Sequence, residues 1–149
     1  MTDAVGFSLS AMKARPTPAI LILSVLCLFA APAAGAAPNG TYKGETAGES
    51  KVKIKVKNNR IIKFESSVYA SCYSDNFIIS FAYPPAGRKG ATVMIKGNGS
   101  FKTVFRGSPN VSFNDDKRTL SGKFTGGRVS GSMKVRGLCS ADTTFTAKK

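Results

Sequence analysis

The segment Lys51–Lys57 alternates lysine with an aliphatic residue over all seven positions, and this alternation constrains the fold more than any other feature of the sequence. Successive side chains of a β-strand point to opposite faces. Val52, Ile54 and Val56 would therefore share one face, and the four lysines would share the other. The segment predicts a strand with one face buried and one face in water.

This strand is expected to form a hairpin with the apolar residues that follow it. A three-residue loop, 57–59, keeps the two apolar faces together, whereas a two-residue turn at Asn58 and Asn59 would set Ile54 against Lys63. We therefore expect the longer loop, with Asn59 in the left-handed conformation. The expected cross-strand pairs are Ile54 with Ile62, Val52 with Phe64, and Lys53 with Lys63.

A second hairpin is predicted around Gly126 and Gly127, which suit a tight primed turn. Its register places every apolar residue on one face. The expected pairs are Phe124 with Val129, Gly122 with Gly131, and Leu120 with Met133. The two facing glycines leave a gap, which either lets the strand bend sharply or admits a large side chain from elsewhere.

Short strands recur to the end of the chain, and no segment after Pro38 keeps a helical apolar spacing for three turns. We expect an all-β fold, a small antiparallel β-barrel or a two-sheet β-sandwich of about eight to ten short strands. The barrel is favoured because hairpins follow one another and glycines inside strands relieve curvature. The other expected strands are Gly40–Thr46, Ser66–Tyr73, Phe77–Tyr83, Thr92–Lys96, Ser100–Phe105, Val111–Phe113 and Thr143–Ala147.

The N-terminal segment, residues 1–36, has the order of features of an export signal. Lys13 and Arg15 precede the uncharged run Ala19–Ala31, and an A-x-A cleavage site follows at 34–36. The alternative is an uncleaved anchor, but a spanning helix needs about 20 apolar residues. We expect translation from Met1 or Met12, cleavage before Ala37, and a single domain over 37–149 that is secreted or associated with the cell envelope.

Two of the three cysteines lie outside the signal segment. Cys27 is within the apolar run, so Cys72 and Cys139 remain in the mature chain. In an exported protein two cysteines are most simply interpreted as one disulfide bond. We expect this bond to join a strand in the middle of the chain to the segment just before the last strand.

The mature chain is strongly basic. Without Lys13, Arg15 and Asp3 it has 20 basic and seven acidic residues, a net charge of +13, and no histidine that would titrate near neutral pH. The expected polyanion contacts are Lys51, Lys53, Lys55 and Lys63, with a second group at Lys123, Lys134 and Arg136. The alternative is that these cations only keep the sheet soluble and discourage edge pairing.

Few residues are suited to catalysis. The absence of histidine excludes Ser-His-Asp triads and histidine-ligated metal sites. The adjacent Asp115 and Asp116 lie in a sequence typical of a turn. We therefore expect a monomeric, non-catalytic domain without cofactor or metal, which binds an anionic polymer, an acidic polysaccharide or an anionic lipid surface rather than nucleic acid. The alternatives are a small secreted hydrolase that works without histidine and a module that binds a protein partner.

Three tyrosines near Cys72 and the proline-containing loop offer a competing hypothesis, sugar binding by aromatic stacking. They are Tyr69, Tyr73 and Tyr83. The chain has no tryptophan, the aromatic residue with the largest stacking surface, and the simpler interpretation places the three tyrosines on the barrel rim with their hydroxyls in water.

Several short motifs are spread along the mature chain. They are Gly40–Gly44, Gly99–Phe101, Leu120–Phe124 and Thr144–Ala147, together with Cys72, Gly131 and Cys139. In these motifs the mature chain resembles, over nearly its whole length, a group of exported proteins of high-GC Gram-positive bacteria that has no assigned activity. This chain departs from that group in its many lysines and its lack of tryptophan. The resemblance implies a small exported β-domain and no particular activity.

Overall fold

The computed structural model describes residues 37–73, 75–107 and 116–149, and within these ranges the fold is all-β without a helix. The predicted signal segment, 1–36, and the predicted strand Val111–Phe113 lie outside the described residues. The nine strands are β1 (Gly40–Thr46), β2 (Lys51–Lys57), β3 (Arg60–Cys72), β4 (Asp75–Tyr83), β5 (Val93–Met94), β6 (Ser100–Arg106), β7 (Lys117–Thr125), β8 (Arg128–Arg136) and β9 (Cys139–Lys148).

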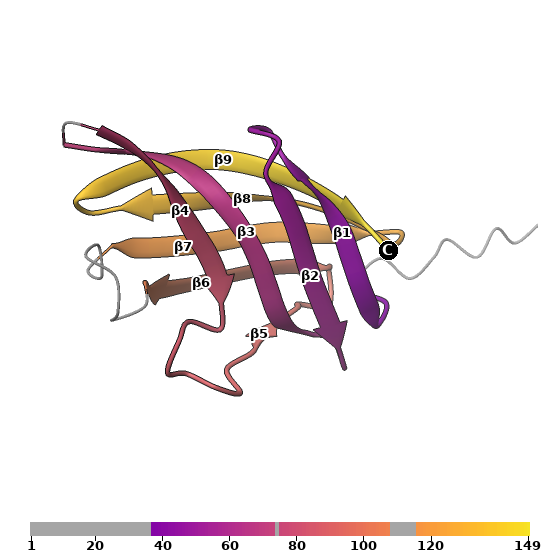
Figure 1. Cartoon of the computed structure of the whole chain (residues 1–149). Helices are drawn as coiled ribbons and strands as arrows, with labels where there is room; N and C mark the ends of the chain where they lie inside the picture. Colours follow the sequence, from indigo (N-terminus) through magenta and orange to yellow (C-terminus); the bar gives the residue numbers. More distant parts are fainter. Residues whose placement is uncertain (1–36, 74, 108–115) are drawn as a thin grey trace, which may run out of the picture.

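All strand pairings are antiparallel, and the sheet order is β4-β3-β2-β1-β9-β8-β7-β6, with β5 attached to β3. A further pairing between β3 and β9 closes β3, β2, β1 and β9 into a small four-stranded barrel. The remaining strands extend this barrel on either side. In Figure 1, β1 to β4 cross in front of β6 to β9. Buried apolar side chains from both groups of strands form one hydrophobic core. The predicted barrel is confirmed.

The hairpin of β2 and β3 has a different register from the one predicted. Asn58 and Asn59 both have positive φ, 51° and 56°, and form a two-residue turn that pairs Lys57 with Arg60. A bulge opposite Lys55 and Val56 then inserts Ile62 as an extra residue. The bulge restores burial of the apolar face, so that the observed pairs are Val56 with Ile61, Lys55 with Lys63, Ile54 with Phe64, and Lys53 with Glu65.

The hairpin of β7 and β8 has the predicted register, with Phe124 opposite Val129, Gly122 opposite Gly131, and Leu120 opposite Met133. Two phenylalanines from other strands fill the gap at the glycine pair. A Cβ atom on Gly122 would lie 2.8 Å from Cζ of Phe101, and one on Gly131 would lie 2.6 Å from Cζ of Phe145. The two glycines therefore make room for aromatic rings in the core.

The predicted disulfide bond between Cys72 and Cys139 is present, with Cα atoms 4.1 Å apart. The two cysteines are cross-strand partners at the β3–β9 pairing. Cys139 is the first residue of β9, so the prediction that it precedes the last strand was wrong: β9 begins four residues earlier than expected. A disulfide in a small β-domain is typical of proteins that fold in oxidising, extracellular compartments.

Candidate functional site: a cationic groove

Four basic side chains lie in succession across four adjacent strands on the outer face of the barrel. Lys43 of β1 faces Lys53 of β2 on one side and Lys148 of β9 on the other. Lys148 in turn faces Arg128 of β8. Opposed Cβ atoms in an antiparallel pair are about 4.5–5.5 Å apart, so like charges at these positions repel and destabilise the sheet. We call these four residues the cation row.

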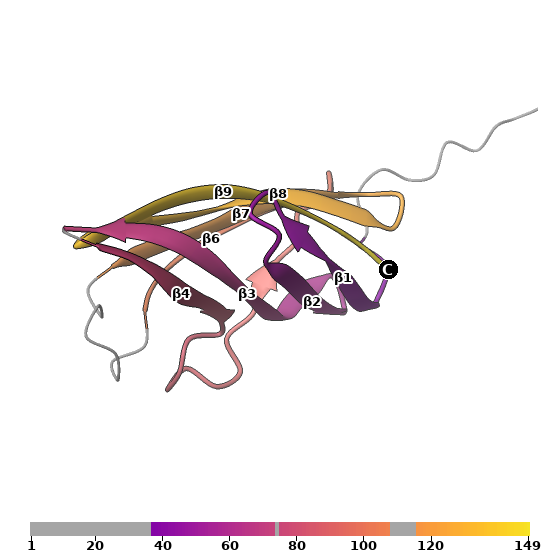
Figure 2. The same cartoon turned by 45° about the horizontal axis from the view of Figure 1, so that its top comes forward.

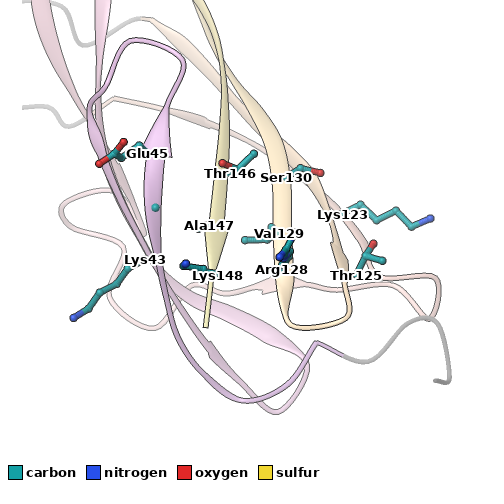
Figure 3. A pocket seen from close by; sticks show the side chains of 11 residues that line it. Lys43, Glu45, Lys123, Thr125, Arg128, Val129, Ser130, Thr146, Ala147 and Lys148 are labelled. Atoms are coloured by element: carbon teal, nitrogen blue, oxygen red, sulfur yellow. The ribbon is translucent and has the colours of Figure 1, made fainter.

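Part of the cation row lines a groove with a volume of about 670 Å³ (Figure 3). Its walls come from β1, β9, β8 and β7, and they carry four cations against one carboxylate, Glu45. The strands approach closely at its floor, because a Cβ atom on Gly44 would overlap the backbone of Thr146 and Ala147. The lining residues are Lys43, Gly44, Glu45, Lys123, Thr125, Arg128, Val129, Ser130, Thr146, Ala147 and Lys148.

The charges of the cation row are not compensated. None of its four members makes an ion pair with another residue in the ranges that the structure describes. Glu65 faces Lys53 across the β2–β3 pairing, but the Glu65 carboxylate lies 2.7 Å from the Lys63 amine instead. The side chains of the row are all exposed, and hydroxyls of Thr125, Ser130 and Thr146 lie among them. The groove can therefore attract an anion by charge and offer it hydrogen bonds.

The lysines predicted as polyanion contacts lie beside this groove rather than in it. Lys51, Lys53 and Lys55 are exposed on the outer face of β2, as expected. Lys63 does not face Lys53, because the bulge at Ile62 shifts the register, and its charge is paired with Glu65. Of the predicted set, Lys53 alone is a member of the cation row.

The second group of predicted polyanion contacts, Lys123, Lys134 and Arg136, also lies only partly in the groove. Lys123 lines the groove. Lys134 and Arg136 instead flank Asp142, with nitrogen-to-oxygen distances of 2.9 and 3.4 Å. The hydrogen bond from Lys134, together with the positive charges of Lys134 and Arg136, lowers the pKa of the Asp142 carboxyl below its ordinary value. These two cations are therefore partly neutralised within the protein.

A buried charged pair lies at the start of β7, and one of its members, Asp116, was predicted to be part of a turn. Asp116 is 1% exposed and Arg118 is 7% exposed. Arg118 Nη1 donates to the Ser80 carbonyl of β4 at 2.6 Å, and Asp116 Oδ1 accepts from the Cys139 amide at 3.5 Å. Burial lowers the pKa of Arg118, and the neighbouring Asp116 charge opposes this effect. The pair connects β7 to the end of the sheet at β4 and to the disulfide.

The groove brings together few of the side chains that acid–base or nucleophilic chemistry uses. The groove has a single carboxylate, and every lysine in the described ranges is exposed, so none is activated by burial beside a serine. No three metal-ligating side chains come together within these ranges. The three tyrosines do not form one stacking surface, because Tyr69 and Tyr73 are exposed whereas Tyr83 is 8% exposed and packs against Phe105.

Comparisons with family models, with curated proteins and with solved structures gave no match to this chain. Among the residues that the structure describes, no helix has the length and apolar character needed to cross a membrane.

Proposed function

We propose that this protein is an exported, non-catalytic β-domain whose cationic groove binds an anionic polymer of the cell envelope. The observation that carries the proposal is the cation row. Folding places Lys43 directly between Lys53 and Lys148, and Lys148 beside Arg128, and none of the four forms an ion pair with a residue that the structure describes. Such an arrangement costs stability in the free protein, and a bound polyanion would relieve that cost.

The direction of the row favours a polymer over a small anion. Neighbouring strands are about 4.8 Å apart, so four successive strands spread the charges over roughly 14 Å. An extended chain with repeated phosphate, sulfate or carboxylate groups could contact all four cations at once. The exposed lysines of β2 recur about 7 Å apart along the strand, so Lys51 and Lys55 extend the same positive surface on either side of Lys53.

The test compares two variants with the same net charge. Lys43→Gln/Arg128→Gln/Lys148→Gln removes three members of the row, and Lys89→Gln/Lys96→Gln/Lys102→Gln removes three exposed cations elsewhere. Binding to long-chain inorganic polyphosphate and to dextran sulfate is measured by calorimetry over a series of salt concentrations.

We expect the row variant to bind about 100-fold more weakly at low salt, since each contact between unit charges in water contributes about 1 kcal/mol. The slope of log K against log salt concentration should fall by about 2 to 3, because fewer counterions are released. The control variant should retain most of the affinity. Equal losses in the two variants would show that only the net charge matters and would contradict the proposal. Binding to anionic vesicles but to neither polymer, if the row variant loses it and the control variant keeps it, would assign the groove to lipid headgroups instead.

A further inference from the structure

Most of the exposed large apolar side chains gather at one corner of the molecule, away from the cationic groove. The described residues include seven such side chains, and five of them belong to the β3–β4 hairpin or to the turn between β8 and β9. We call these five the apolar corner. They are Tyr69 (70% exposed), Tyr73 (93%), Phe77 (42%), Ile78 (64%) and Leu138 (49%).

The backbone holds the apolar corner together. Tyr69 and Ile78 face each other across the β3–β4 pairing, on the outer face of the sheet. The disulfide joins the residue before Tyr73 to the residue after Leu138, so these two side chains extend from a shared covalent link. In Figures 1 and 2, the β3–β4 and β8–β9 turns project at the same end of the molecule. The corner is therefore a projection rather than a groove.

Three cations lie on adjacent strands at the same end of the barrel as the apolar corner. Arg136 of β8 faces Lys117 of β7, and Lys117 faces Arg106 of β6. All three side chains are exposed. The described residues of this end also include Lys134, the buried Arg118 and three carboxylates, Asp75, Asp116 and Asp142, so its described part keeps a net positive charge. Long basic side chains can place their methylene groups on an apolar surface while their charges remain at the level of lipid phosphates.

We propose that the apolar corner is a docking site for an anionic lipid bilayer, independent of the groove and its polymer. Tyrosine is enriched at membrane–water interfaces because its ring is apolar and its hydroxyl stays hydrated. Interfacial binding combines buried apolar area with attraction between cations and anionic lipids, and this corner offers both. A second copy of this basic chain would instead bring two sets of like charges together.

The protein contains no tryptophan, so a single introduced tryptophan reports on one position only. Tyr73→Trp places it at the apolar corner, and Thr125→Trp places it in an exposed part of the groove as a control. The disulfide-bonded protein is mixed with vesicles of phosphatidylglycerol and phosphatidylcholine in equal parts, or of phosphatidylcholine alone. Quenching by lipids brominated on their acyl chains measures insertion.

We expect a blue shift and strong quenching for Tyr73→Trp with the anionic vesicles, weaker effects with phosphatidylcholine, and neither effect for Thr125→Trp. Quenching of Thr125→Trp alone, or of neither variant, would overturn the proposal. Because tryptophan itself favours membranes, the same vesicles are tested without it. Tyr69→Ser/Ile78→Ser/Leu138→Ser should bind the anionic vesicles at least about tenfold more weakly, while its binding to polyphosphate stays unchanged.

The failure of this proposal can be distinguished from failure of the polymer proposal. The groove variant Lys43→Gln/Arg128→Gln/Lys148→Gln should still insert Tyr73→Trp into anionic vesicles, although it binds polyphosphate poorly. A wild-type dimer in sedimentation that the triple serine variant dissociates would assign the apolar corner to self-association and would contradict lipid docking.

Discussion

Strand β9 pairs with β3 at its start and with β1 at its other end, and the two ends are stabilised in different ways. At its start, Cys139 is bonded to Cys72, and Asp142 neutralises part of the charge of Lys134 and Arg136. At its other end, Lys148 lies between two cations, and no acidic residue in the described ranges pairs with it.

The two ends of β9 show that a high positive charge does not by itself indicate a binding surface. Cations at the first end are partly used within the protein, in ion pairs and hydrogen bonds to backbone carbonyls. Cations at the second end repel one another, and they make no such ion pair or hydrogen bond with the residues that the structure describes. Uncompensated charge, rather than charge as such, is therefore what distinguishes the groove as a site for an anion.

The largest expected effect on stability comes from removing the disulfide at the start of β9. Cys72→Ala/Cys139→Ala should lower the free energy of unfolding by about 4 kcal/mol, because the bond closes a loop with a sequence separation of 67. Urea unfolding followed by circular dichroism measures this change. Under conditions in which the variant remains folded, its polyphosphate affinity should match that of the wild type, since the groove lies at the other end of β9. A loss below about 1 kcal/mol would show that strand pairing alone holds β3 to β9.

The two hairpins show how far a sequence can predict such a fold. The β7–β8 register was predictable because Gly126 and Gly127 define the turn and every apolar residue then falls on one face. The β2–β3 register was not predictable, because two arrangements bury the apolar faces equally well: a three-residue loop, and a two-residue turn followed by a bulge at Ile62. A bulge of this kind leaves no mark in the composition of the strand.

The cationic groove could be predicted only in part. Alternation along β2 identified Lys53 as an outward-facing residue. The alternation could not show that Lys43 and Lys148 lie side by side, because they are brought together by the pairing of the first strand, β1, with the last, β9. Lys148 also lies just beyond the strand predicted for that segment. Pairings between distant strands are decided by the closure of the barrel, which local patterns do not record.

A smaller effect on stability is expected from removing one charge of the cation row at the other end of β9. Lys43→Gln removes two like-charge contacts at once, with Lys53 and Lys148, and should raise the free energy of unfolding by about 1 kcal/mol at low salt. The gain should shrink at high salt as the repulsion is screened. Lys102→Gln is the control, because Lys102 faces Ser121 and no cation. Unchanged or lower stability in Lys43→Gln would mean that the row is not strained.

The smallest expected effect concerns the compensated end and its dependence on pH. The hydrogen bond and charge of Lys134, with a smaller contribution from Arg136, lower the pKa of Asp142 in the folded protein below its ordinary value of 3.8. A carboxyl group with a lowered folded-state pKa stabilises the fold at pH values above its unfolded pKa. This contribution is lost as the pH falls from about 4 through the folded-state pKa, where the carboxylate becomes protonated in both states.

Asp142→Asn should therefore lower the melting temperature slightly at pH 6 and leave it unchanged at about pH 2, so the two melting curves converge in acid. Glu49→Gln is the matched control, because Glu49 makes no ion pair with a described residue, and it should follow the wild type at every pH. The effect is small because all three side chains of the cluster are about half exposed, where water and salt screen the attraction. A constant difference between Asp142→Asn and the wild type at all pH values would show that the carboxylate charge does not stabilise this end of β9.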